Sequence, residues 1–385
     1  MSEGRPLIPV ARPLLGEPEA EAARRAILSG WVTQGPEVAA FEGEFAAAVG
    51  APHACAVSSC TTALHLALLA AGVGPGDEVV TVSHSFIATA NAIRYCGALP
   101  VFVDVDLATF NMDPALVEAA ITPRTRALLL VHQLGMPCDL AALVAAARRR
   151  GLAVIEDAAC AIGSEIRWDG QWQRIGRPHG DLACFSFHPR KLLSTGDGGM
   201  IVTADAEADA RLRLLRQHGM SVADTVRHAS ARVVFEDYPV LGFNYRMTDI
   251  QAAIGRAQLK RLDGIVERRR ALAARYTAAL AGVPGVTTPD EPAWARSNWQ
   301  SYAVRLDAAD QRTVMQRMLD EGVSTRRGVM NVHREGAYPP GTWRAAGPLA
   351  RGERAQDTAI VLPLYHQMTT DEQDRVVGAL VRALA

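Results

Sequence analysis

One lysine in this sequence stands where an amine could do covalent chemistry. Lys191 lies in a polar turn that follows the apolar residues 185–187, and the glycine-rich residues 196–199 come after it. A lysine amine held between two strands can condense with a carbonyl group when burial or cationic neighbours lower its pKa. A solvated surface lysine is the commoner occupant of such a turn, so Lys191 by itself decides nothing.

A carboxylate ends an earlier apolar run. Asp157 follows residues 153–156, and a charged group at the end of a buried strand is costly unless it is paired. A protonated pyridine nitrogen would provide that pairing, and the pairing would make the ring a good electron sink. The competing interpretation is a carboxylate that caps a helix or bonds a core hydroxyl.

Small and hydroxyl residues form a third candidate site. Residues 58–62 read Ser-Ser-Cys-Thr-Thr and precede a helical pattern. Free backbone N–H groups and the helix dipole at such a position can hold an anion. Ordinary N-capping is the alternative, because Ser and Thr are preferred there in any case.

Each of these three features follows a strand-like run. In doubly wound sheets, ligands bind beyond the carboxyl ends of the strands, so the three features would meet at one edge. An anion cradle, a partner for a pyridinium nitrogen and an amine together predict a site for pyridoxal phosphate. The combination is far more specific than any one of its parts.

The elements that would position these residues alternate along the chain. Short apolar runs are separated by helical patterns, which indicates an α/β fold with a mostly parallel, seven-stranded sheet covered on both faces. The predicted strands are residues 54–58, 78–82, 101–105, 127–131, 153–156, 183–187 and 200–203. Helices are predicted at residues 17–28, 35–49, 61–71, 86–95, 113–120, 139–149, 205–217 and 248–262.

The C-terminal part predicts a smaller α+β unit. A long helix at residues 265–280 precedes three prolines, Pro284, Pro289 and Pro292, which suggest a crossing between domains. Strands at residues 302–306 and 323–326 and helices at 309–321 and 370–384 would follow. The predicted organisation is an N-terminal arm at 1–16, a large domain at 17–262 and a small domain at 263–385.

Composition excludes several classes of protein. The chain has 385 residues, and its 40 basic and 41 acidic residues leave a formal net charge of -1, with no basic block that would follow a nucleic acid. No stretch approaches the roughly 20 apolar residues of a membrane span, and the N-terminus has no signal core. The six cysteines are scattered, which favours reduced thiols over a disulfide frame or a metal site. We expect a soluble cytoplasmic protein without a metal.

The sequence resembles the DegT/DnrJ/EryC1/StrS family of fold-type-I, pyridoxal-phosphate-dependent enzymes, which are mostly sugar aminotransferases. The resemblance covers nearly the whole chain and rests on segments that occur in the family's order. These segments are residues 30–36, 59–64, 85–90, 102–106, 132–139, 155–159, 186–191 with 196–199, 242–247 and 362–365.

The resemblance implies roles at the reaction centre. Lys191 would form a Schiff base with the cofactor and shuttle a proton between the substrate carbon and the cofactor's C4′. Asp157 would bind the pyridine nitrogen. Phe86 would stack on one face of the ring, although it could instead be plain core.

The resemblance also implies how the phosphate is held. Thr61, the backbone of Cys60 and Ser186 would bind it, and Asn244 would reach across a homodimer interface to the phosphate of the partner subunit. A turn is the other use of an asparagine at that position.

Two cysteines depart from the family's pattern. Glycine is usual where Cys60 stands, so the backbone would approach the phosphate differently. Gln or His is frequent where Cys160 stands and touches the cofactor's phenolic oxygen. A thiol is a weaker hydrogen-bonding group, so we expect Cys160 to alter the tuning of the cofactor.

Substrate recognition is assigned to loops around the site. Arginine forks at Arg326 and Arg327 suit a nucleotide diphosphate or the carboxylate of an amino donor. A solvated basic pair is the alternative. The candidate substrate-binding residues are Trp31, His188, Arg327 and His333.

The predicted reaction is a ping-pong amino transfer. L-Glutamate or L-glutamine would convert pyridoxal phosphate to pyridoxamine phosphate (PMP), and a nucleotide-linked keto sugar would then receive the amine. One alternative acceptor is a keto-inositol, which would make the protein an aminocyclitol aminotransferase. A cofactor-dependent sugar dehydratase and a non-catalytic regulator on the same fold are further alternatives. Lys191 argues against the dehydratases, which carry histidine there, and the intact Lys191 and Asp157 argue against the regulator.

Overall fold

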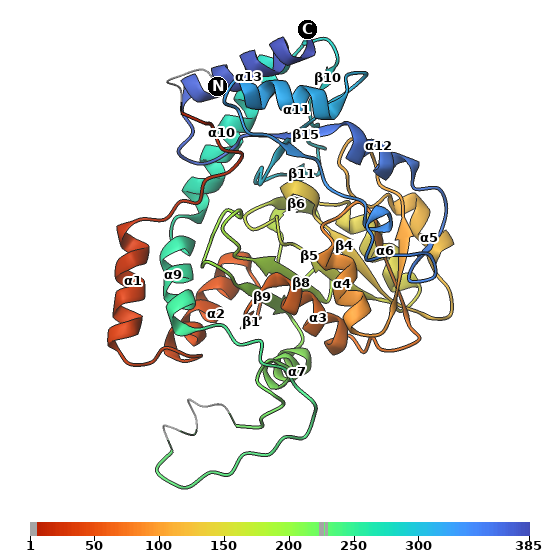
Figure 1. The fold of residues 1–385 in the computed structure, drawn as a ribbon. Coiled ribbons are helices and arrows are strands. Elements are labelled where there is room, and N and C mark those ends of the chain that lie inside the picture. The colour runs from red at the N-terminus through yellow and green to blue at the C-terminus, as the bar shows by residue number, and fades with distance from the viewer. Residues whose placement is uncertain (1–5, 223–226, 228–229) are drawn as a thin grey trace.

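A large, mostly parallel sheet forms the centre of the molecule (Figure 1). The computed structural model describes residues 6–222, 227 and 230–385. Its main sheet has eight strands in the order β1-β9-β8-β5-β4-β2-β3-β14, and only β9 runs antiparallel to its neighbours. The strands are β1 (His53–Val57), β2 (Glu78–Val82), β3 (Leu99–Val103), β4 (Thr125–Val131), β5 (Ala153–Asp157), β8 (Leu182–Ser186), β9 (Gly199–Thr203) and β14 (Arg344–Ala345).

The predicted α/β class is confirmed, and all seven predicted strands are present. The eighth strand, β14, has two residues and comes from the Gly- and Pro-rich C-terminal stretch, which gave no strand pattern. It pairs in parallel with β3 at the edge of the sheet.

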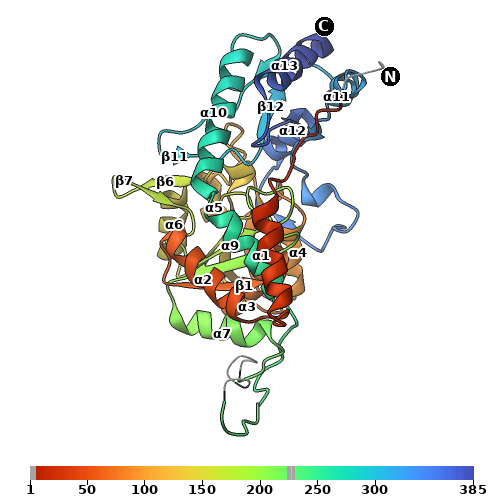
Figure 2. The same cartoon turned by 90° about the vertical axis from the view of Figure 1, so that its left-hand side faces the viewer.

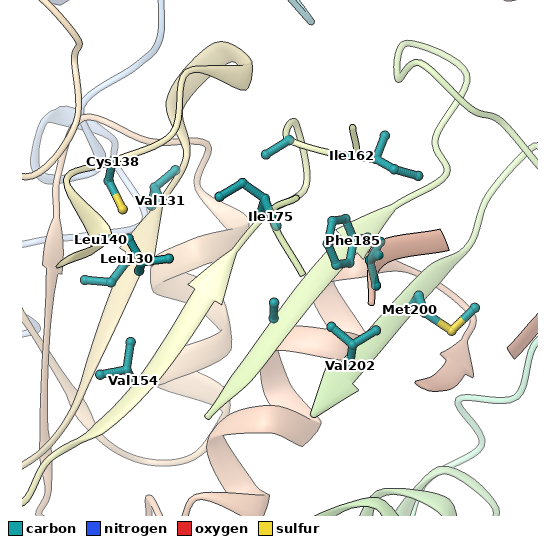
Figure 3. Packing of buried hydrophobic residues seen from close by; sticks show 14 of the residues in the cluster. Leu130, Val131, Cys138, Leu140, Val154, Ile162, Ile175, Phe185, Met200 and Val202 are labelled. Atoms are coloured by element: carbon teal, nitrogen blue, oxygen red, sulfur yellow. The ribbon is translucent and has the colours of Figure 1, made fainter. Parts of the chain in front are cut away.

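Helices cover both faces of the sheet because successive strand residues alternate between them. In β1, Cys55 and Val57 pack under α3 (Cys60–Ala70), α4 (Ala88–Tyr95) and α7 (Ala206–Arg216). Ala54 and Ala56 face the opposite layer, which includes α2 (Pro36–Val49) and α6 (Leu140–Arg149). Figure 3 shows this second layer, where side chains of β4, β5, β8 and β9 pack together; Leu130, Val154, Phe185 and Val202 are labelled.

A smaller antiparallel sheet lies beyond the main one. The helix α10 (Leu262–Leu280) runs from the main body to this region (Figure 2). The sheet order is β10-β12-β15-β13, and α11 (Gln311–Asp320) and α13 (Thr370–Leu384) pack together within the same apolar cluster. Its strands are β10 (Val286–Thr287), β12 (Tyr302–Leu306), β13 (Arg326–Arg327) and β15 (Ala359–Leu362). The proposed domain limits at 16/17 and 262/263 stay predictions.

Several further elements complete the fold. Sequence patterns did not predict α12 (Ala350–Thr358), β15, or the sheet of β6 (Glu165–Trp168), β7 (Gln171–Arg174) and β11 (Ala295–Arg296). The remaining helices are α1 (Glu17–Leu28), which packs on α9 (Asp249–Leu259), and the short η1 (Pro114–Leu116), α5 (Val117–Ala120), η2 (Gln133–Gly135) and η3 (Val332–Arg334). Among the described helices, none has the length and apolar character needed to cross a bilayer.

Candidate active site

A cavity of about 390 Å³ opens at the carboxyl ends of the main-sheet strands. Residues that follow β1, β2, β4, β5 and β8 form one wall, and residues of β13 and β15 contribute from the smaller sheet. Its volume is in the range of sites that bind small molecules or cofactors. Nine of the twelve candidate catalytic, cofactor-binding and substrate-binding residues line it, namely Cys60, Thr61, Phe86, Asp157, Cys160, Ser186, His188, Lys191 and Arg327.

Lys191 lies half-buried in this cavity, on the loop after β8. Its backbone N–H donates to the carbonyl of His188 at 2.8 Å, and its Nζ atom donates to Sγ of Cys160 at 3.0 Å. Burial acts to lower the pKa of Lys191, but Cys160, Cys60 and Asp157 together act to raise it, and on balance the pKa lies above its ordinary value. Lys191 therefore has to lose a proton before its amine can attack a carbonyl.

Asp157 ends β5 and is 7% exposed. One carboxylate oxygen accepts from the hydroxyl of Thr89 at 2.7 Å, and the other accepts from the N–H of Ala159 at 3.2 Å. Burial raises the pKa of Asp157, although these two donors and the charge of Lys191 oppose the rise. Each oxygen retains a lone pair for a further donor, so the carboxylate can accept the N–H of a protonated pyridine.

Thr89 is a site residue that the sequence reasoning missed. It lies on α4, and its hydroxyl also shares a hydrogen bond of 2.7 Å with the hydroxyl of Ser85. Both residues belong to the segment 85–90 that carried part of the resemblance, so the hydroxyl side chains of that segment were the sequence feature that could have indicated this contact. Thr89 orients the carboxylate of Asp157 rather than lining the cavity.

The N-terminus of α3 is compatible with both interpretations of the Ser- and Thr-rich residues, which are helix capping and anion binding. Ser59 caps the helix, because its hydroxyl accepts from the N–H of Thr62 at 3.2 Å. Within the described chain, however, the N–H groups of Cys60 and Thr61 have no acceptor. They remain available to an anion in the cavity.

Gly199 allows this helix end to approach the sheet. A Cβ atom there would lie 2.5 Å from the backbone carbonyl of Ser59 and 2.7 Å from the nitrogen of Cys60. Close backbone contact therefore requires glycine at position 199. Nearby, the hydroxyl of Ser186 accepts from the N–H of His188 at 3.4 Å and completes the same wall.

The donor set of the cavity fits pyridoxal phosphate. Free N–H groups suit its phosphate, the carboxylate of Asp157 suits its ring nitrogen, and the amine of Lys191 suits its aldehyde. Phe86, which is 57% exposed at the cavity, provides an uncovered aromatic face beside them.

The substrate-binding candidates fall into two groups. His188 and Arg327 line the cavity together with Arg326 and with Arg190, which the sequence reasoning had not selected. Burial and the guanidinium of Arg190 lower the pKa of His188. Arg327 is half-exposed and lies 3.7 Å from the carboxylate of Glu335.

The other candidates lie outside the cavity of this chain. His333 bonds to the hydroxyl of Ser83 at 2.6 Å and to the carboxylate of Glu353 at 3.1 Å. Trp31 donates through Nε1 to the carbonyl of Gln34 at 3.1 Å. Asn244 is exposed, and its side-chain oxygen accepts from Nε of Arg246 at 3.2 Å.

Comparisons with known proteins agree with this geometry. The model of the DegT/DnrJ/EryC1/StrS aminotransferase family matches residues 13–381. The spore coat polysaccharide biosynthesis protein SpsC of Bacillus subtilis (strain 168) is 40% identical over 378 residues, which cover 97% of this chain and 96% of SpsC. The aminotransferase TlmJ from Streptoalloteichus hindustanus is 37% identical, with a TM-score of 0.89 over 98% of this chain and 99% of TlmJ. The PMP form of Spr1654 from Streptococcus pneumoniae is 25% identical, with a TM-score of 0.91 over 98% of each chain.

Proposed function

Because this chain belongs to the DegT/DnrJ/EryC1/StrS family of sugar aminotransferases, we propose that it moves an amino group from L-glutamate or L-glutamine to a nucleotide-linked ketodeoxysugar. Pyridoxal phosphate is the cofactor on which this family's transamination depends. The observation that supports this specific reaction is the convergence of Lys191, Asp157 and the α3 N-terminus on a cavity that three arginines border.

The residues of the chain divide the work. When bound, pyridoxal phosphate supplies an aldehyde that exchanges amines and a ring that withdraws electrons. The amine of Lys191 would hold the cofactor through its aldehyde carbon and would carry the proton that the exchange moves at the substrate carbon. Asp157 would accept the N–H of the ring nitrogen, and Phe86 would pack beside the ring.

The phosphate contacts are assigned to the opposite wall. The N–H groups of Cys60 and Thr61, the hydroxyl of Thr61 and that of Ser186 would hold the phosphate at the positive end of α3. Asn244 contributes from the partner subunit of a homodimer, which accords with its exposure in this chain.

The acceptor is inferred from charge at the cavity. Arg190, Arg326 and Arg327 line it, and Lys191 adds a fourth positive charge, against the carboxylates of Asp157 and Asp197. Guanidinium groups bind phosphates in bidentate fashion, so a nucleoside diphosphate fits this border better than a neutral cyclitol. His188 lies beside these arginines as a further contact.

A substrate trial tests the assignment. We expect turnover with a nucleotide-linked keto sugar and loss of more than about 1 kcal/mol of acceptor binding when the diphosphate is removed. The keto-inositol acceptor of an aminocyclitol aminotransferase would be supported if it turned over as fast without any nucleotide. Glutamate and glutamine are compared as donors in the same assay.

The assembly and the location are part of the proposal. The segment between α7 and α9 extends away from the main body of the molecule (Figure 1). It carries exposed apolar side chains, among them Phe235 and Leu241, which a second copy would cover. We expect a homodimer by light scattering, and a Phe235→Asp variant that is more monomeric. A cytoplasmic location is tested by cell fractionation.

A further inference from the structure

Residues 297–300 form a linker between β11 and β12, and this linker contacts both loops of the reaction centre. We propose that Asn298 and Gln300 in this linker are positioning residues that keep Cys160 in contact with Lys191. The importance of that contact for amino transfer rests on the proposed role of Lys191. The contact itself is a property of the fold.

Asn298 holds the loop that carries Cys160. Its side chain is fully buried, and Nδ2 donates to the carbonyls of Cys160 and Ile162, each at 2.8 Å. Its backbone N–H donates to the hydroxyl of Ser164 at 3.0 Å. Two groups of Asn298 thus make three hydrogen bonds to residues 160–164, which tie the loop after β5 to the linker.

Gln300 holds the loop that carries Lys191. Its Nε2 atom donates to the carbonyl of Arg190, the residue before Lys191, at 2.5 Å. Its own backbone N–H donates to Oδ1 of Asn298 at 2.8 Å. The backbone of Gln300 is therefore bonded to the side chain of Asn298, and the side chains of Asn298 and Gln300 are bonded to the cysteine loop and the lysine loop, respectively.

A buried arginine of α10 holds the backbone of the linker itself. Arg269 on α10 is buried and donates to the carbonyls of Trp299 at 2.8 Å, Gln300 at 2.7 Å and Leu364 at 3.1 Å. A buried guanidinium bonded to main-chain carbonyls loses these bonds if the linker moves. Gly135 packs against the side chain of Asn298, because a Cβ atom on Gly135 would lie 2.1 Å from Oδ1 of Asn298.

Two measurable properties distinguish a positioning residue from one that only supports the fold, namely the unfolding temperature and the reactivity of Cys160. A buried amide that only stabilises the fold lowers the unfolding temperature when it is removed, and leaves the chemistry of a distant thiol unchanged. Replacing a positioning residue instead changes how readily the loop that it holds opens locally. Cys160 reports on this directly, because the other five cysteines are buried and Cys160 is half-buried.

The experiment measures alkylation of Cys160 by iodoacetamide in the full-length holoenzyme, with peptide mass spectrometry to assign the site. Asn298→Ala and Gln300→Ala are compared with wild type. Gln373→Leu is the matched control, because Gln373 is a buried amide that donates to a main-chain carbonyl, that of Leu272, away from the cavity. Thermal unfolding is recorded for every variant.

We expect Cys160 to be alkylated about tenfold faster in Asn298→Ala and Gln300→Ala. The midpoint of the pH titration of the lysine-bound cofactor's absorption should also shift in both. Gln373→Leu should unfold at a lower temperature with the wild-type alkylation rate.

The inference is overturned if both linker variants lose thermal stability while Cys160 reacts at the wild-type rate. If Asn298→Ala does not fold, Gln300→Ala alone decides, because its side chain makes a single bond. A failure of the proposed amino transfer would appear in the turnover assay and leave the alkylation rates unaffected, so the two results are separable.

Discussion

Nζ of Lys191 donates a hydrogen bond to Sγ of Cys160 over 3.0 Å, although 31 residues separate them in the sequence. The contact joins the residue expected to react with the cofactor to the one at which this chain departs from its family. It also helps to keep the pKa of Lys191 above its ordinary value, against the effect of burial.

Replacing Cys160 by Ala should accelerate capture of pyridoxal phosphate by protein stripped of its cofactor. Capture requires the neutral amine, whose fraction rises about tenfold per pH unit below the pKa of Lys191. Without the thiol that pKa falls, so the rate-versus-pH curve should move to lower pH. Stopped-flow absorbance measures it, with Cys96→Ala as the control. An unchanged curve in Cys160→Ala would show that the thiol does not govern the amine.

Replacing Asp157 by Asn should separate activity from stability. Loss of the charge beside the ring nitrogen should lower kcat by about 10²–10³-fold. Because burial raises the pKa of Asp157, the folded state favours the protonated acid, and its ionisation costs stability as pH rises from the unfolded pKa through the folded one.

Asparagine at position 157 cannot ionise, so the Asp157→Asn variant does not lose stability in this way as pH rises. Calorimetry of the stripped protein at pH 8 should therefore show an unfolding midpoint no lower than that of wild type. A large drop in the midpoint would mean that the charge of Asp157 is needed for folding instead.

Replacing Gly199 by Ala should weaken the phosphate site. The new Cβ would overlap the backbone at Ser59, so the N-terminus of α3 must shift, at a cost of about 1–3 kcal/mol of stability. Equilibrium dialysis should show about tenfold weaker binding of pyridoxal phosphate for each 1.4 kcal/mol lost at the site. Gly264→Ala is the control, because that helical glycine has open space around it and alanine should be neutral or stabilising there. Equal cofactor affinity in both variants would rule out the cradle.

A buried ionic network should control stability at acidic pH. Glu42 accepts hydrogen bonds from Arg213, Arg216 and the N–H of Ala56. Burial acts to raise the pKa of Glu42, but the two guanidinium groups lower it on balance. Its contribution is therefore present above the unfolded pKa of 4.5 and disappears as pH falls through the lower folded pKa.

Removing Glu42 should take the carboxylate partner from the buried Arg216, whereas Arg213 keeps its ion pair with Asp209. Urea unfolding of Glu42→Ala at pH 7 should show a loss of about 3–5 kcal/mol. The difference from wild type should shrink under strongly acidic conditions. Glu21→Ala, which removes an exposed carboxylate paired with Arg24, should leave the urea midpoint unchanged. A similar midpoint for both variants would contradict the importance of the network.

Local patterns predicted the parts of the site that lie on strand ends. Asp157 and Ser186 each close an apolar run, and parallel strands bring such ends to one edge. The same argument placed Lys191 at the cavity. The main strands were predictable because they are continuous apolar runs, whereas β14 and α12 lie in polar sequence whose structure depends on packing against the large sheet.

Contacts between distant segments could not be predicted from spacing. The bond from Thr89 to Asp157 spans 68 residues, and the bonds from Asn298 to Cys160 and from Gln300 to Arg190 span 138 and 110. Each depends on how loops meet after the sheet has formed. His333 illustrates the reverse case, since its side chain is engaged by Ser83 and Glu353 outside the cavity of its own chain.

The central claim is that Lys191 holds the cofactor covalently, and the sequence makes a direct test possible because it has only two lysines, Lys191 and Lys260. Borohydride reduction of the holoenzyme, followed by proteolysis and mass spectrometry, locates the pyridoxyl group. The account predicts it on Lys191 and absent from Lys260, which is exposed at the end of α9. A pyridoxyl group on Lys260 alone, or a Lys191→Ala variant that still turns over, would contradict it.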